Sequence, residues 1–389
     1  EMSERIKNLV AQYNGRYGDG SNIRLFRAPG RVNLIGEHTD YNDGFVFPVA
    51  IDRDILIAAT PRTDRQVNLH ALDFGTSVTF DLDNIDHESG EAWGCYPKGV
   101  AAVLQQEGIP LTGFDGVLNG TVPLGAGLSS SAALEVAMAT LFSAFSETEI
   151  PGPRMAQLCQ RAENEYAGVQ CGIMDQFISC VAQPDTALFL DCRSLTYENI
   201  PFEAPSHTLV IANTNKPRGL VDSEYNKRRE ECEEGVRLLG DHMEGITALR
   251  DVSPEQFSAH RDALPDVVAN RCEHVIEEND RVLRSVEALQ ANDLNRFGRF
   301  MNASHDSLRD LYEVSCRELD VMVEIARSCA GVLGSRMTGG GFGGCTITLV
   351  ETDAVTPLET KLREQYPSQT GFTPDIYVCR PADGAGEVS

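Results

Sequence analysis

The segment of residues 123–137, PLGAGLSSSAALEVA, joins two glycines and three serines to an apolar run of helical length. Gly125 and Gly127 permit unusual backbone angles and a close approach of the main chain to a ligand. Free N–H groups and the helix dipole at the start of such a helix attract anions such as phosphate. The serine hydroxyls add donors or a Mg²⁺ ligand. A serine-capped core helix after a glycine turn explains the same residues. A Walker A loop does not, because no lysine follows the glycines.

Residues 22–215 are rich in short apolar runs separated by Gly, Asp and Pro, a pattern typical of β-strands. The runs are IRLFRA, GFVFPVAI, ILIAAT, QVNLHAL, SVTFDL, FDGVLNGTV, TALFLDC and HTLVIANTN. Helices are expected at residues 93–106, from 128 onward, at 153–167 and at 174–181.

The chain then changes character, and charged amphipathic patterns predict helices at 223–239, at 266–289 and, as one or two more, within 294–328. GGGFGGCTITLV enters a strand, a short helix is expected near 357–365, and DIYVCRP closes as a strand. This mixture without strict βαβ alternation favours an α+β fold. We expect an N-terminal domain, 1–205, and a C-terminal domain, 206–373. The last strand, about 374–385, could return to the first domain.

Charge is concentrated in residues 28–44, APGRVNLIGEHTDYNDG. Glu37, His38 and Asp40 offer several hydrogen-bond donors and acceptors within one turn region, as a polyhydroxylated ligand such as a sugar requires. Arg31 is permanently charged and can pair with a carboxylate or a phosphate. A salt-bridged surface loop is the alternative interpretation of these charges.

Two further segments carry weaker signals. In ENEYAGVQCGIMDQF, Glu163 and Asp175 flank a Gly/Cys turn, and Asp175 lies among apolar neighbours. A carboxylate there needs a partner or a function, although capping the helix that it begins would also explain it. In MTGGGFGGC, five glycines within residues 339–344 allow tight packing against a ligand or a strand, or form a flexible hairpin loop.

Composition limits the partners and the compartment. The net charge of −25 argues against nucleic acid or an anionic membrane as the main partner. The apolar runs are too short to cross a membrane, and the N-terminal stretch EMSERIKNLVAQ lacks the apolar core of a signal peptide. The 11 Cys are scattered without a CxxC pair, which favours reduced thiols. We therefore expect a cytoplasmic protein. The acidic, lysine-poor composition fits adaptation to salt as well as ordinary solubility.

Together, these segments resemble the motifs of galactokinases, within the superfamily that also includes homoserine, mevalonate and phosphomevalonate kinases. GRVNLIGEHTDYNDG is similar to the galactokinase sugar signature, and CGIMDQ to the segment that bears the family's proposed catalytic Asp. PLGAGLSSSAALE and TGGGFGG resemble the phosphate-binding motif and the third glycine-rich motif of the superfamily. The sugar signature is highly specific, whereas the two glycine-rich motifs are shared across the superfamily.

The resemblance implies a two-domain α+β kinase fold with the active site in the cleft between the domains. It also implies transfer of the γ-phosphoryl group of ATP to the anomeric hydroxyl of α-D-galactose, the first committed step of galactose catabolism. Asp175 would be the base or the orienter of the sugar hydroxyl, and Arg31 would neutralise charge beside it. Hydrogen bonds to the sugar would come from Glu37, His38, Asp40, Asp43, backbone near Gly172, and Tyr225.

The resemblance also implies a site for ATP and its metal ion. The ATP phosphates would lie in a loop formed by Gly125, Ala126, Gly127, Leu128, Ser129, Ser130 and Ser131. Ser131 and Glu163 would lie near Mg²⁺, directly or through water. Trp93, the only Trp, would lie near the adenine, although a half-buried core tryptophan explains it equally well.

Other functions stay open on the sequence alone. A non-enzymatic galactose sensor shares these motifs, but such fungal regulators lack a Ser-Ala pair that here stands intact as Ser131-Ala132. A kinase for N-acetylgalactosamine would differ in the room at the sugar 2-position, which short motifs do not report. The intact GEHTDYNDG disfavours mevalonate or homoserine kinase. We expect galactose and ATP as partners, no nucleic acid, no membrane, and a monomer.

Overall fold

The computed structural model describes residues 2–19, 22–202, 205–217 and 221–388. Its largest sheet has six strands in the order β13-β1-β3-β6-β4-β5. The strands are β1 (Arg24–Asn33), β3 (Pro48–Pro61), β4 (Gln66–Ala71), β5 (Thr76–Asp81), β6 (Phe114–Gly120) and β13 (Gly386–Val388). The sheet is mixed, since β4 and β6 run parallel while β1 and β3 pair antiparallel.

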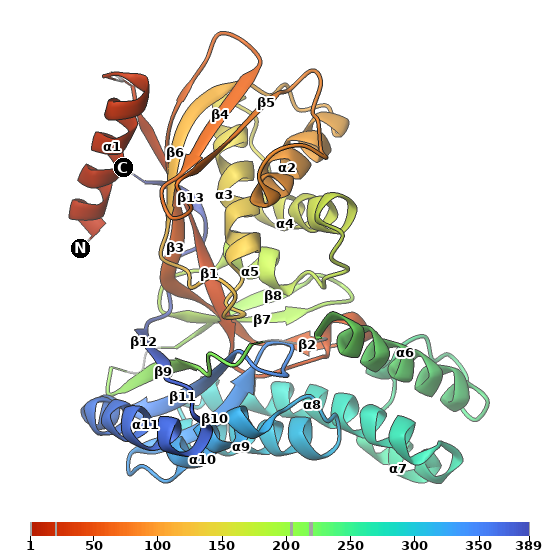
Figure 1. The fold of residues 1–389 in the computed structure, drawn as a ribbon. Helices are drawn as coiled ribbons and strands as arrows, with labels where there is room; N and C mark the ends of the chain where they lie inside the picture. Colours follow the sequence, from red (N-terminus) through yellow and green to blue (C-terminus); the bar gives the residue numbers. More distant parts are fainter. Residues whose placement is uncertain (1, 20–21, 203–204, 218–220, 389) are drawn as a thin grey trace.

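Helices cover both faces of this sheet. Helix α1 (Met2–Tyr17) packs against β3 and β6 on one face (Figure 1). The other face is covered by α2 (Cys95–Gln106), α3 (Ser130–Phe145), α4 (Gly152–Ala162) and α5 (Met174–Val181). Helix α3 contacts β1, β3 and all three neighbouring helices, which explains why its sequence is apolar on every side.

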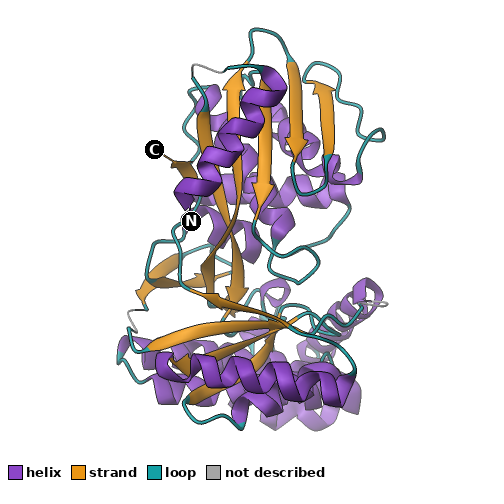
Figure 2. Ribbon diagram, turned by 60° about the vertical axis from the view of Figure 1, so that its left-hand side comes forward, coloured by secondary structure: helices purple, strands orange, loops and turns teal. Residues whose placement is uncertain are grey.

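A second, antiparallel sheet has the order β10-β11-β9-β12. Its strands are β9 (His207–Asn213), β10 (Val332–Thr338), β11 (Cys345–Glu351) and β12 (Asp375–Cys379). A layer of helices lies against one face (Figure 2), consisting of α8 (Asp266–Gln290), α9 (Leu294–Asp310), α10 (Arg317–Arg327) and α11 (Val355–Thr370). Helices α6 (Val221–Gly240) and α7 (Pro254–His260) pack beside α8.

A small sheet with the order β2-β7-β8 lies between these two parts (Figure 1). It consists of β2 (Phe45–Val46), β7 (Thr186–Asp191) and β8 (Tyr197–Pro201), and it contacts both β3 and α8. Short helical turns complete the chain: η1 (Asp40–Asn42), η2 (Ala92–Gly94), the π-helix η3 (Glu163–Ala167), η4 (Leu249–Asp251), η5 (Arg261–Ala263) and η6 (Thr352–Ala354). Among the described residues, no helix has the length and apolar character that crossing a membrane requires.

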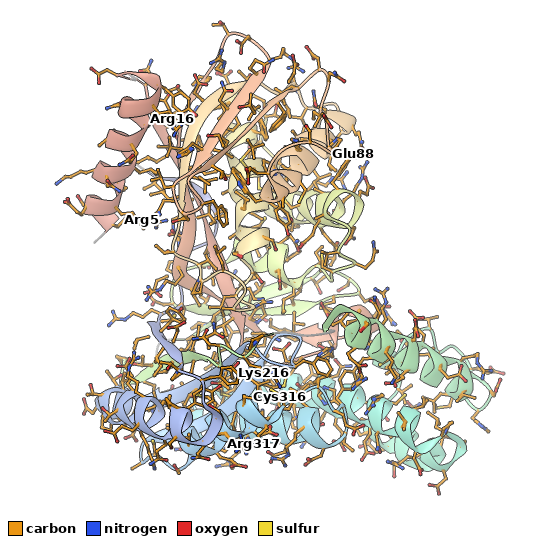
Figure 3. All side chains as sticks on the ribbon, viewed as in Figure 1. Arg5, Arg16, Glu88, Lys216, Cys316 and Arg317 are labelled. Carbon is orange, nitrogen blue, oxygen red and sulfur yellow. The ribbon has the colours of Figure 1, made fainter. Side chains whose placement is uncertain are left out.

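The predicted α+β fold class is confirmed, and most predicted elements lie within a few residues of observed ones. One prediction is wrong: GFVFPVAI and ILIAAT are not separate strands, because both contribute to the single strand β3. The polar break between them does not end the strand, since Asp54 is buried and paired. It accepts from Arg27 Nε at 2.5 Å and from Arg5, which reaches the sheet from α1 (Figure 3).

The end of the chain contributes a strand to each of the two larger sheets. DIYVCRP forms β12 and pairs with β9 in the second sheet, so this strand does not join the first one. The segment that does return is β13, which pairs with β1 through Leu25 and Val388. The predicted boundary near residue 205 directly follows residues 203–204, which lie outside the described residues, and it stays a prediction.

Candidate active site

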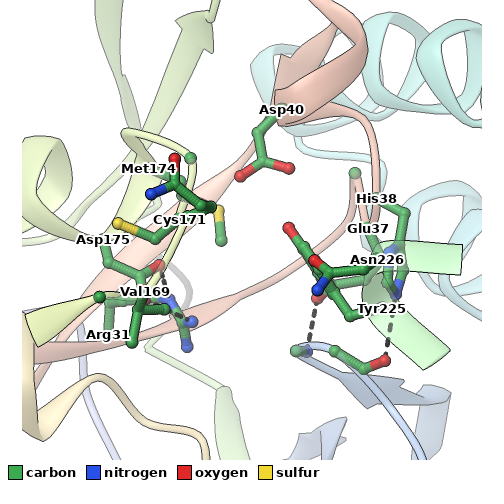
Figure 4. Close-up of a pocket in the computed structure, with 16 residues that line it drawn as sticks. Arg31, Glu37, His38, Asp40, Val169, Cys171, Met174, Asp175, Tyr225 and Asn226 are labelled. Carbon is green, nitrogen blue, oxygen red and sulfur yellow. Dashed lines mark hydrogen bonds and ion pairs between the residues drawn. The ribbon is translucent and has the colours of Figure 1, made fainter. Parts of the chain in front are cut away.

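A cavity of about 330 Å³ lies where segments from both parts of the chain meet (Figure 4). Seven of the predicted site residues line it: Arg31, Glu37, His38, Asp40, Gly172, Asp175 and Tyr225. They come from β1 and the loop after it, from the start of α5 and the turn before it, and from α6. Gly339 and Gly340 of the glycine run line the same cavity. Four stretches that are far apart in the sequence therefore converge on one cavity.

Arg31 and Asp175 form a bidentate ion pair at the edge of this cavity. Arg31 Nε donates to Asp175 Oδ1 at 2.7 Å and Nη2 donates to Oδ2 at 3.0 Å. The guanidinium is 7% exposed, whereas the carboxylate is 30% exposed and faces the cavity. Burial alone would lower the pKa of Arg31, but Asp175 raises it, so the guanidinium stays charged. The geometry fixes the direction in which the carboxylate faces.

The predicted phosphate loop is tied to this ion pair. Arg31 Nη1 donates to the carbonyl oxygen of Gly127 at 2.8 Å. The backbone N–H of Arg31 donates to the carbonyl oxygen of Leu128 at 3.1 Å. Gly125 and Gly127 have φ of 68° and 79°, the left-handed region that favours glycine. Helix α3 starts at Ser130, so its free N–H groups face the end of the loop.

Ser129 has a partner that the sequence did not indicate. Its hydroxyl donates to Asp175 Oδ2, so both oxygens of that carboxylate are already bound by protein groups. In this structure the side chain of Ser129 contacts Asp175, and the expected binding of ATP phosphates by Ser129 stays a prediction. No local pattern could reveal this contact, because the two residues are 46 positions apart.

Asp40 lines the cavity (Figure 4) and lies in close contact with Gly172, which lines it too. A Cβ added to Gly172 would overlap the carboxylate of Asp40, which explains why a residue without a side chain occupies this position. Burial raises the pKa of Asp40 to about 6, and the neighbouring Asp175 and Glu37 add to this rise. The carboxylate of Asp40 therefore changes its charge close to neutral pH.

The loop that carries Glu37 is held by residues of the C-terminal half. The backbone N–H of Glu37 donates to Glu278 Oε2 at 3.2 Å, and the backbone carbonyl of Glu37 accepts from His274 Nε2 at 3.2 Å. Its side-chain Oε1 accepts from the N–H of Gly339 at 2.9 Å and lies 3.2 Å from Nη2 of the fully buried Arg336. Burial alone would raise the pKa of Glu278, but Arg281, His274 and Arg336 lower it to about 2.

Asp43 does not lie with the other predicted sugar-binding residues at the larger cavity. It is absent from the described residues that line the cavity, and its carboxylate pairs with Arg193 at 3.3 Å with 47% of the side chain exposed. The left-handed backbone of Asp43, with φ of 56°, turns the chain into β2 at this point. A sugar-binding role for Asp43 is therefore not carried into the proposed function.

Ser131 and Glu163 lie together at the start of α3. Ser131 Oγ donates to Glu163 Oε1 at 3.3 Å, and Gln176 Nε2 donates to Oε2 of the same carboxylate at 2.5 Å. Burial raises the pKa of Glu163 and that of the adjacent, fully buried Glu135, whose Oε1 has no hydrogen-bond partner within the described part of the chain. Among the described residues, no cluster of three or more His, Cys, Asp or Glu could hold a metal ion by itself. One carboxylate and a hydroxyl suit Mg²⁺, which takes its other ligands from phosphate and water.

A second cavity of about 230 Å³ adjoins the phosphate loop and includes Trp93. Phe74 stacks on the Trp93 ring at 6.1 Å between centroids, and Trp93 Nε1 donates to Thr76 Oγ1 at 3.0 Å. Leu124 and Phe74 are 57% and 46% exposed, unusual for large apolar side chains. These flat apolar walls beside Ser130 suit a planar base. The sequence indicated Trp93 but not Phe74, which lies in a turn.

Comparison with known proteins identifies the class to which this fold and site belong. Residues 96–183 match the N-terminal domain of GHMP kinases, and residues 285–368 match the C-terminal domain of GHMP kinases. A mevalonate kinase of Methanococcus jannaschii has the same fold, with a TM-score of 0.68 at 21% identity over 93% of this chain and 99% of that one. The protein is thus a kinase of the GHMP class.

Closer relatives narrow the assignment. Residues 11–61 match the galactokinase galactose-binding signature. A galactokinase of Roseiflexus sp. (strain RS-1) is 49% identical over 98% of this chain and 96% of that protein. The crystal structure of Lactococcus lactis galactokinase complexed with galactose matches with a TM-score of 0.94 at 38% identity, over 99% of this chain and all of that one. The chain belongs to the galactokinase family.

Proposed function

We propose that this sugar kinase transfers the γ-phosphoryl group of ATP to the anomeric hydroxyl of α-D-galactose and forms galactose 1-phosphate and ADP. The observation that supports this most strongly is the Arg31–Asp175 ion pair. It stands between a polar cavity that contains Glu37, Asp40 and Tyr225 and the glycine loop that leads into α3. Family membership and the galactose-bound relative favour galactose as the acceptor.

Phosphoryl transfer depends on alignment and charge neutralisation more than on covalent help from the protein. The carboxylate of Asp175 accepts a hydrogen bond from the anomeric hydroxyl, either as base or as orienter. Arg31 holds that carboxylate in place and neutralises charge as the oxygen attacks. The backbone N–H groups at the start of α3 and in the glycine turn bind the phosphates.

Ser131 and Glu163 fit Mg²⁺ by the chemistry of their oxygen donors, and we propose that they hold it. When bound, the ion neutralises charge on the ATP phosphates. Glu37, through its second carboxylate oxygen, Asp40, Tyr225 and backbone at Gly172 bind the sugar hydroxyls. Trp93 and Phe74 bind the adenine between apolar surfaces. A monomer in the cytoplasm remains the expectation from the sequence.

An ADP-release assay with Mg-ATP tests the proposal, with galactose, N-acetylgalactosamine, glucose or no sugar offered side by side. Turnover on galactose well above the other sugars is expected. Preferred turnover on N-acetylgalactosamine would instead make the protein a kinase for that sugar. If no sugar is turned over but galactose raises Tm in the presence of ATP, the protein is a sensor and the proposed function is wrong.

Gly172→Ala should raise the KM for galactose about tenfold or more, since the new methyl group must displace the carboxylate of Asp40. Steady-state kinetics with varied galactose measure the effect. The matched control is Gly15→Ala on α1, where an added Cβ meets no described atom within 4 Å. This control should keep wild-type kinetics. An unchanged KM in Gly172→Ala would show that the position of Asp40 does not matter for the sugar.

Lowering the pH through about 6 should raise the KM for galactose. Burial raises the pKa of Asp40 to about 6, so above this pH the carboxylate is charged and accepts strongly from sugar hydroxyls. Below it the group is protonated, and KM should increase by up to about tenfold per pH unit. In Asp40→Asn, KM should be high and independent of pH. A wild-type KM that is constant from about pH 5 to about pH 8 would contradict this role.

A further inference from the structure

Lys98 is one of five lysines in the chain, and its ammonium group is enclosed by the protein. It lies in the first turn of α2 and is 3% exposed. Its Nζ donates to the carbonyl oxygen of Asp86 at 2.6 Å and to that of Ser89 at 2.7 Å. Burial of a charge is costly unless hydrogen bonds replace the lost water. The buried ammonium group therefore ties the start of α2 to the loop that precedes it.

The loop between β5 and η2, to which both carbonyls belong, is held by few contacts. The Asp86 carboxylate accepts from the N–H of Glu88 at 3.0 Å and from that of Ser89 at 3.2 Å, and Glu88 is labelled in Figure 3. The ring of His87 stacks on that of Tyr166 in η3, with 4.4 Å between centroids. The side chains of this stretch are exposed. Because they bury little apolar surface, the polar contacts determine how firmly the loop is held.

The hydrogen bond from Lys98 to Ser89 closes a ring of chain that contains Trp93. The two bonded residues are nine positions apart. Trp93 and Tyr96 lie between them, and both line the second cavity. The backbone of Trp93 belongs to η2, a 3₁₀ turn of three residues, which has weak hydrogen-bond geometry of its own. The closed ring therefore restrains the backbone from which the indole ring projects.

The ammonium group acts from outside the cavities. Lys98 is not among the described residues that line either of them. Its donors face the carbonyl groups of the loop, and it is nearly fully buried. Direct contact with ATP phosphates would require an exposed ammonium group. Any effect of Lys98 on the nucleotide must therefore pass through the loop and Trp93.

We propose that Lys98 is a positioning residue for the nucleotide. By closing the segment of residues 89–98, it holds the Trp93 ring where the base binds, and it does not itself contact ATP. The inference rests on the proposed function only for the binding of adenine at Trp93, and it is independent of the identity of the sugar.

Fluorescence tests the position of the ring directly, because Trp93 is the only Trp in the chain. Lys98→Met keeps the approximate length of the side chain and removes its donors and its charge. Acrylamide should quench Trp93 more strongly in this variant. ADP should protect Trp93 from acrylamide, and the variant should need about three to ten times more ADP than the wild type for equal protection. Unchanged quenching and protection in the variant, or no protection by ADP in the wild type, would overturn the inference.

The fluorescence experiment uses neither sugar nor turnover. If galactose is not the acceptor but ADP protects Trp93 and the variant responds as expected, the inference stands while the proposed function fails. The two proposals can therefore fail separately.

Kinetics distinguish positioning from a general loss of stability. Lys98→Met should raise the KM for ATP by about three- to tenfold, with the KM for galactose and kcat within about twofold of wild type. A lysine that only stabilises the fold would change both KM values together and lower Tm. Equal changes in the two KM values would therefore contradict the proposal.

Two further variants keep the test decisive if Lys98→Met folds poorly. Asp86→Ala removes an exposed acceptor that shapes the loop, and it should raise the KM for ATP by a smaller factor. Lys361→Met is the matched control, since Lys361 Nζ donates to the carbonyl and hydroxyl oxygens of Ser328 at 3.3 and 2.7 Å, beside α10. It should leave the KM for ATP and the quenching of Trp93 unchanged. An unaffected KM for ATP in Asp86→Ala, or equal effects of the two lysine variants, would refute the role of Lys98.

Discussion

Asp175→Asn should lower kcat by about a thousandfold or more and change galactose affinity by less than about tenfold. The carboxamide keeps the volume of the side chain but has one acceptor instead of two. Its NH₂ group must face either Arg31 or Ser129, both of which donate to the native carboxylate. The acceptor that meets the sugar hydroxyl is lost, while the cavity keeps its other walls. The ADP-release assay gives kcat, and calorimetric titration with galactose gives the affinity.

Asp115→Asn is the matched control for this variant. Asp115 is an ion-paired carboxylate on β6 that binds Arg62 Nη1 at 2.9 Å, and it is not among the described residues that line either cavity. Its replacement should leave kcat unchanged. Near-normal turnover by Asp175→Asn would contradict the role of Asp175, and equal losses in both variants would point to general destabilisation.

Arg31→Lys should lower kcat about a hundredfold, and Arg31→Met should lower it further and reduce Tm. Lysine cannot donate to both oxygens of Asp175 and to the carbonyl of Gly127 at once, because its charge lies at a single point. Methionine leaves the carboxylate and the carbonyl without their partner in a mostly buried place. Turnover and thermal unfolding of both variants provide the measurement.

Arg24→Lys offers a control on the same strand. Arg24 also makes a bidentate pair, with Glu387 at 2.7 Å for both bonds, but the two side chains are 39% and 43% exposed. Exposed pairs contribute about 0–1 kcal/mol, so turnover and Tm should stay near wild type. If Arg31→Lys behaves like Arg24→Lys, the charge of residue 31 suffices, and the two-point contact with Asp175 has no special role.

The sequence predicted those features that short, local patterns determine. Helix α5 was predicted at its observed bounds, and the site residues near Arg31, Glu37 and Asp175 lie within motifs read along the chain. The prediction of the galactokinase family is confirmed by the comparisons. Patterns of this kind report turns, helix starts and charge, each of which is set by adjacent residues.

The features that were missed depend on contacts between distant residues. Asp43 resembles its neighbours in charge, yet the turn into β2 places it beside Arg193 and away from the cavity. Ser129 lies within the phosphate motif, yet its hydroxyl meets Asp175. Phe74 forms part of a cavity wall because the turn between β4 and β5 lies next to Trp93. Periodicity contains no information on such pairings.

The support of the Glu37 loop by Glu278, His274, Arg336 and Gly339 limits how sugar preference can be engineered. Transplanting the GEHTDYNDG peptide into a related kinase would move the ligand-facing atoms without the groups that hold their backbone. The residues that recognise the sugar are therefore discontinuous in the sequence. A transplant would have to include α8 and β10 along with the signature. Directed changes of sugar preference should vary those supporting positions together with the loop.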